Sequence, residues 1–129
     1  MNSQIKQIII ANSSLLVLDL LWIYYFMGDK YNLLVNTIQG SKMKLNPYSA
    51  MGAYLLMICV MGNFVIKYKL SYLDTFILGF CLYGVYDLTC GAIFKNWDFN
   101  LAFVDMLWGG LVYTVSLYIS KQLIERTRF

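Results

Sequence analysis

Four long apolar stretches separated by short polar segments dominate the pattern of the chain. They cover residues 8–27, 48–66, 75–94 and 101–120, and none of them contains Lys, Arg or His. An α-helix needs about 20 predominantly apolar residues to cross the hydrocarbon core of a bilayer. The pattern therefore predicts an all-α fold, in which residues 1–129 form a single domain built as a four-helix transmembrane bundle.

The connecting segments indicate how these helices are arranged. Residues 67–74 and 95–100 are tight links, so the second, third and fourth helices are expected to pack as antiparallel neighbours. Residues 28–47 form a longer connector, whose Asn46-Pro47 pair favours a turn before the second helix. Lys and Arg number six in the N-terminus, the second link and the tail, against four in the other two connectors. This bias predicts that both termini lie in the cytoplasm.

Composition supports a multi-pass location in a membrane. Hydrophobic residues make up 60% of the chain and charged residues 13%, against about 45–50% and 25% in soluble domains. A soluble domain of this size could not bury so much apolar surface, and the same composition excludes a disordered or nucleic-acid-binding protein. The absence of His from the sequence removes His-ligated zinc and His-based catalysis. We expect the lipid bilayer as partner, a possible homo-oligomer, and no metal or cofactor.

Three aspartates inside the predicted helices are the most informative residues. An Asp at the centre of a membrane-spanning helix costs about 2.5–3.5 kcal/mol, yet Asp19, Asp87 and Asp105 all lie within the apolar stretches. At 1.5 Å per residue they lie about 12, 10 and 6 Å from the outer ends of their helices. They should therefore meet at one level as a polar cluster, held by uncharged donors or by a bound proton or cation.

Asp and Trp share the same spacing in the first and fourth helices. Trp22 follows Asp19 by three residues, and Trp108 follows Asp105 by three, so each pair lies on one helix face. Because the two helices run in opposite directions, Trp22 lies near the depth of Asp105 and Trp108 near that of Asp19. We therefore expect each indole N–H to donate to the carboxyl group on the facing helix. The alternative is that both tryptophans are interfacial anchors with chance spacing.

The third helix adds candidate donors and close-packing positions. Tyr83, Tyr86 and Thr89 are candidate members of the polar cluster, although plain helix packing explains Tyr83 and Thr89 equally well. Three glycines near Asp87 or Asp105 would let another helix approach closely: Gly84, Gly91 and Gly109.

Three ordered motifs resemble the predicted membrane proteins of domain-of-unknown-function family 2177, found in bacteria and large DNA viruses. The motifs are residues 18–22, 86–89 and 104–109, and Trp97 matches a tryptophan usual in the third connector. The resemblance spans nearly the whole chain and implies four transmembrane helices, but it supplies no activity. Cys90 stands where the family usually has Asn, so a role for that amide is not carried over.

Three functions remain open from the sequence. The interpretation that demands least is a structural or partner-binding bundle, held by hydrogen bonds between intramembrane Asp and Trp. A second is binding or transport of protons or a small cation through the Asp cluster. A third is a membrane-embedded enzyme acting on a lipid or isoprenoid. No motif for a nucleophile–base pair or a metal appears, which disfavours an enzyme.

Overall fold

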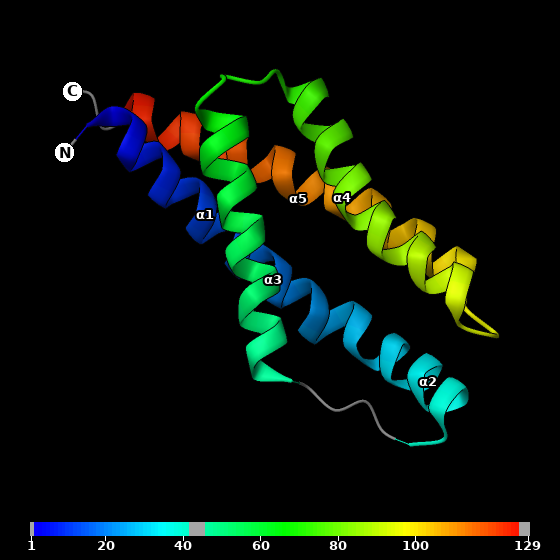
Figure 1. Ribbon diagram of the computed structural model, residues 1–129. Coiled ribbons are helices and arrows are strands. Elements are labelled where there is room, and N and C mark those ends of the chain that lie inside the picture. The colour runs from blue at the N-terminus through cyan, green and yellow to red at the C-terminus, as the bar shows by residue number, and fades with distance from the viewer. Residues whose placement is uncertain (1, 42–45, 127–129) are drawn as a thin grey trace.

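The computed structural model describes residues 2–41 and 46–126, which are almost entirely helical (Figure 1). Helix α1 (Ser3–Trp22) continues through a π-helical segment (Ile23–Met27) into α2 (Gly28–Gln39), and α3 (Pro47–Val60) continues through a second π-helical segment (Met61–Ile66). Helices α4 (Tyr72–Ile93) and α5 (Phe99–Arg126) complete the chain. These helices form four stretches long and apolar enough to cross a membrane, which confirms the predicted fold class.

The first helix is longer than predicted, because α2 occupies most of the segment assigned to a connector. Residues Tyr31, Leu34 and Ile38 follow helical spacing, and they pack against a small core of Cys90, Trp97 and Ala102. The helix ends at Gly40, whose φ of 75° is left-handed and whose N–H donates to the carbonyl of Asn36, a common helix C-terminus. Lys42 and Lys44, part of the predicted connector, lie outside the described residues.

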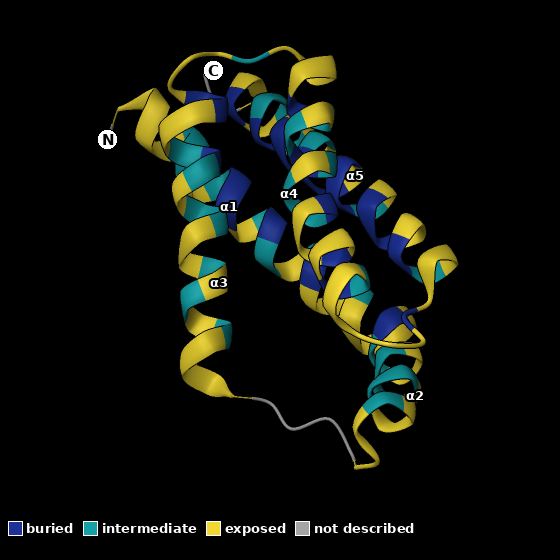
Figure 2. Cartoon of the chain, turned by 45° about the vertical axis from the view of Figure 1, so that its right-hand side comes forward, coloured by how far each residue is buried: buried dark blue, intermediate teal, exposed yellow. Residues whose placement is uncertain are grey.

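Helix α5 is the centre of the bundle. It packs most extensively on α4 and also along α1, while the second π-helical segment packs on α1. Figure 2 shows buried positions along much of α5, whereas α3 is exposed or intermediate along its length. The core contains Ala11 and Leu15 of α1, the segment around Met61, and Tyr113 of α5.

The second and third helices run in opposite directions, as predicted (Figure 1), but the expected packing between them is weak. Within the described residues, α3 makes no extensive contact with α4, although α4 and α5 do pair as predicted. Glycines explain why α4 pairs closely with α5. The backbones of the two helices come so near that an added Cβ on Gly79 of α4 would lie 2.9 Å from the carbonyl carbon of Gly109 of α5. Small residues of this kind direct helix packing in membranes, and α3 has no comparable contact, since a Cβ on Gly52 would meet nothing within 4 Å.

Side-chain caps set where α3 and α4 begin. The Asn46 side chain accepts hydrogen bonds from the N–H groups of Tyr48 and Ser49, with Pro47 in the first turn, as the Asn-Pro pair predicted. Ser71 caps α4 by accepting from the N–H of Asp74. The second link is therefore shorter than predicted, and α4 begins at Tyr72.

Candidate functional site

Asp19 of α1 is bonded to all three of the other long helices. Its carboxyl oxygen Oδ1 accepts from the Tyr83 hydroxyl of α4 at 2.7 Å and from Trp108 Nε1 of α5 at 3.0 Å. The Tyr54 hydroxyl of α3 donates to Oδ2 at 3.0 Å. We call these four residues the Asp19 node. Asp19 is only 5% exposed, and all three of these donors are neutral side chains.

Asp87 and Asp105 form a second acidic site between α4 and α5, which we call the Asp87–Asp105 pair. The Tyr31 hydroxyl of α2 donates to Asp87 Oδ1 at 2.6 Å, and Trp22 Nε1 of α1 donates to Asp105 Oδ1 at 3.3 Å. The two carboxyl groups lie within interaction range of each other. Asp87 is fully buried, and its Oδ2 has no hydrogen-bond partner among the described residues.

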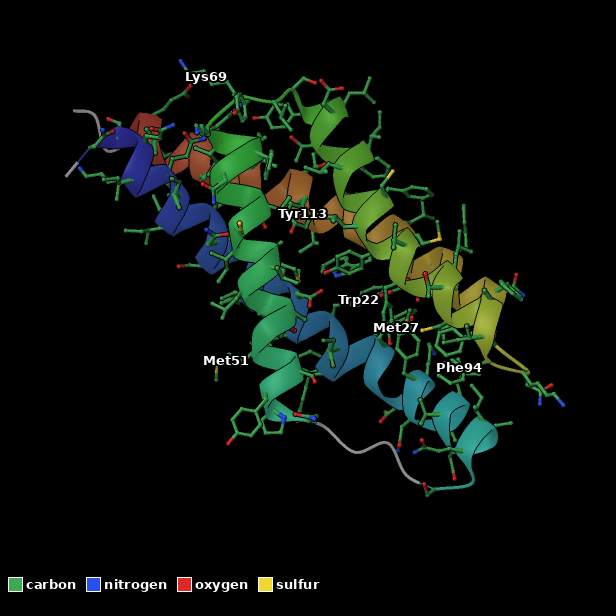
Figure 3. All side chains as sticks on the ribbon, in the orientation of Figure 1. Trp22, Met27, Met51, Lys69, Phe94 and Tyr113 are labelled. Carbon is green, nitrogen blue, oxygen red and sulfur yellow. The ribbon has the colours of Figure 1, made fainter. Side chains whose placement is uncertain are left out.

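The two sites are joined by the tryptophans that serve them. Both predicted indole–carboxyl hydrogen bonds are present, so the reciprocal geometry of α1 and α5 is confirmed. In addition, the rings of Trp22 and Trp108 stack in parallel, with centroids 4.6 Å apart and an interplanar angle of 6°. Figure 3 shows Trp22 directed from α1 into the space between α1 and α4. The stacked rings thus connect the Asp19 node with the Asp87–Asp105 pair.

The similar depths of the three aspartates had suggested one cluster, but their hydrogen bonds divide them between two sites. Asp87 lies beside Asp105, whereas Asp19 is bonded through its own set of donors. The spacing itself explains this division. Since Trp22 and Trp108 are each three residues from an Asp, reciprocal bonding places Asp19 and Asp105 about one helical turn apart in depth.

The other predicted site residues divide between the interior and the lipid-facing surface. Tyr83 belongs to the Asp19 node. Tyr86 is 59% exposed and Thr89 is exposed, and no hydrogen bond from either to an aspartate occurs in the described part of the chain. The structure therefore does not place Tyr86 or Thr89 among the donors to the aspartates.

The three predicted close-packing glycines all lie against other side chains. An added Cβ on Gly84 would lie 2.9 Å from the end of the Met106 side chain, and one on Gly91 would lie 2.5 Å from the Phe99 ring. A Cβ on Gly109 would meet the Tyr83 ring and the backbone of α4. Gly109 thus allows Tyr83 to reach Asp19.

Sequence reasoning missed two of the donors, Tyr31 and Tyr54. Tyr31 was placed in a connector, although its helical spacing with Leu34 and Ile38 could have indicated an amphipathic helix. Tyr54 lies in an apolar helix with no comparable signal. It is half-buried, since α3 reaches the bundle interior through this side chain and few others.

A family model covers most of the chain. It is the model of DUF2177, described as a predicted membrane protein, and it matches residues 4–121. The chain belongs to this family. No curated protein and no solved structure gives a match. Family membership and the four apolar helices together place the protein in a membrane as a multi-pass protein.

Proposed function

We propose that this DUF2177 protein binds and exchanges a proton at the Asp87–Asp105 pair, and that the Asp19 node holds the bundle together around it. The observation that carries the proposal is the buried oxygen Oδ2 of Asp87, which has no hydrogen-bond partner among the described residues. A buried acceptor without a donor is costly. A proton on the neighbouring Asp105 carboxyl group, or on Asp87 itself, would remove that cost.

Electrostatics favour a single shared proton. Two carboxylates side by side in a low-dielectric site repel each other strongly, so that one of them retains its proton. The two groups then titrate as a unit rather than as separate residues. Tyr31 and Trp22 each donate one hydrogen bond to the pair, and neither brings a positive charge that would stabilise two carboxylates.

The surrounding side chains favour a proton over a multivalent metal ion. In residues 2–41 and 46–126, no group of three or more His, Cys, Asp or Glu side chains is placed to hold a metal ion. Such ions need several anionic or oxygen ligands, whereas two carboxyl groups suffice to share one proton.

Infrared difference spectroscopy of the reconstituted protein tests this proposal. A protonated carboxyl gives a C=O stretching band separate from that of a carboxylate. We expect this band at neutral pH in the unmodified protein and in Asp98→Asn, a matched control in the third connector. The double variant Asp87→Asn/Asp105→Asn should lack the band, and vesicles containing it should take up fewer protons than control vesicles under an imposed potential.

The proposal fails if the unmodified protein shows no band from a protonated carboxyl at neutral pH, or if the double variant retains it. A folded double variant with unchanged proton uptake would also count against exchange at this site.

The Asp19 node favours a second candidate function, a structural or partner-binding bundle. Because Asp19 bonds to α3, α4 and α5 at once, its carboxyl group could serve only to fix how the helices are arranged. Single Asp→Asn variants separate the two candidates. Loss of folding in all three variants would support a purely structural role, whereas intact folding with lost proton uptake in Asp87→Asn and Asp105→Asn would support the pair as a proton site.

A further inference from the structure

A hollow of about 260 Å³ lies at the end of the bundle where α1 begins and α5 ends (Figure 1). Its apolar wall comes from the second π-helical segment and from α5, through Val65, Ile66, Leu117 and Ile124, each of which is at least nine-tenths buried. This hollow is remote from both acidic sites, which lie about two or more helical turns further along α5. The hollow therefore needs an explanation of its own.

Two lysines from different elements line the hollow. Lys69 comes from the link after the second π-helical segment, and Lys121 comes from the last turns of α5. The Lys121 ammonium lies 4.6 Å from the centre of the Tyr72 ring, which holds its charge near the start of α4. Glu125 also lines the hollow, so the two lysines leave a net positive charge there.

The backbone at Lys69 has an unusual conformation for a lysine. Its φ is +53°, in the left-handed region that Gly and Asn adopt most readily. This turn lets the N–H groups of Lys69 and Leu70 donate to the carbonyls of Ile66 and Val65, closing the end of the helix. A Gly or Asn would close the helix as well and with less strain, so helix termination alone does not account for a lysine here.

We propose that this hollow binds one anionic phospholipid, with its phosphate between Lys69 and Lys121 and part of an acyl chain against the apolar wall. Charge complementarity supports the choice, because the described residues at this end of the bundle include five cations (Lys6, Lys67, Lys69, Lys121 and Arg126) and two anions (Asp74 and Glu125). Basic residues at the ends of membrane helices attract anionic lipids in this way. A free phosphate ion would leave the apolar wall without a function.

Native mass spectrometry of the protein released from detergent can measure the bound lipid. The probe is an equimolar mixture of phosphatidylglycerol and phosphatidylcholine with the same acyl chains. We expect the unmodified protein to retain one phosphatidylglycerol in preference to phosphatidylcholine. In the variant Lys69→Asn/Lys121→Gln this preference should fall roughly 10- to 30-fold, as the loss of two cations near the membrane surface implies.

A matched control removes the same charge elsewhere at this end of the bundle. Lys6→Gln/Lys67→Gln also lowers the net charge by two, but neither residue lines the hollow. The single variant Lys69→Asn keeps a residue suited to a left-handed φ, and its fold should be intact, so it tests the site even if the double variant is unstable. Equal losses in the control, equal retention of the two lipids by the unmodified protein, or displacement of the lipid by inorganic phosphate would each overturn the proposal.

Discussion

Asp19 and Asp87 are both buried aspartates in apolar helices, but their surroundings differ in one decisive respect. Asp19 accepts three hydrogen bonds and uses both of its carboxyl oxygens. Asp87 accepts a single hydrogen bond from Tyr31, lies next to another carboxyl group, and keeps one buried oxygen without a partner among the described residues. One acid is thus surrounded by donors, while the other lies beside a second acid.

This difference shows how a membrane bundle can use the same residue type in two ways. An aspartate that receives hydrogen bonds from three helices gains stability from a fixed structure, because both of its carboxyl oxygens already have donors. An aspartate paired with another acid depends on a proton for its hydrogen bonding, so its contacts change when the proton leaves. The Asp19 node is therefore suited to holding the helices, and the Asp87–Asp105 pair to responding to proton binding.

Replacing Asp19 with Ala should have the largest effect. Three donors on three helices would lose their acceptor at once, and interhelical hydrogen bonds in membranes contribute about 0.6–1.7 kcal/mol each, so we expect a loss of roughly 2–5 kcal/mol in the free energy of unfolding. Asp87→Ala removes only one such hydrogen bond, and it also relieves Asp105 of the carboxyl group beside it, so its loss should be smaller. Unfolding in mixed micelles of increasing denaturing-detergent content, followed by circular dichroism, measures both. Equal losses in the two variants would remove the distinction between the sites.

Gly109→Ala should damage the Asp19 node without changing any polar group. The added Cβ would overlap the Tyr83 ring and lie 2.6 Å from the carbonyl oxygen of Gly79, so Tyr83 or the helix backbone must move. Overpacking of this kind costs about 1–3 kcal/mol, measurable in the same unfolding experiment. Gly52→Ala is the matched control, because a Cβ there would meet nothing within 4 Å. The infrared band of the Asp87–Asp105 pair should be present in both variants; its loss in Gly109→Ala would mean that the two sites are not independent.

The number and approximate positions of the membrane-spanning helices could be predicted from the apolar stretches of the sequence. Apolar length located the four helices, but it missed α2, because Asp29 and Lys30 interrupt the apolar run just where the helix continues. The pairing of α3 could not be predicted either. Helices that face both lipid and protein are apolar all round, so their hydrophobic pattern does not show which face contacts a neighbour. Only the glycines of α4 and α5 carried that information.

The part of the candidate site that could be predicted is the pair of Asp–Trp contacts, because both depend on one alignment of α1 against α5. The Asp–Trp spacing on α1 and α5 determines both reciprocal contacts once the helices are antiparallel, and both are present. The tyrosine donors depend instead on how each helix is rotated about its axis. The chain has 11 tyrosines, and the spacing of Tyr31 indicates at most a helix face. No local pattern shows that Tyr31 and Tyr54 donate to aspartates whereas Tyr86 is exposed.

Double-mutant cycles on the two tryptophans test whether each acidic site has its own indole donor, and they should give the smallest effects. We expect a coupling energy of about 0.5–1.5 kcal/mol between Trp22→Phe and Asp105→Asn, and a similar value between Trp108→Phe and Asp19→Asn, because each pair shares one interhelical hydrogen bond. Phe keeps an aromatic ring in the stack while removing the N–H donor. Trp22→Phe combined with Asp19→Asn is the control cycle, and its coupling should be smaller, since Trp22 donates to Asp105 and not to Asp19. If all three cycles gave the same coupling, the stacked rings rather than the hydrogen bonds would connect the residues, and the two acidic sites would behave as one.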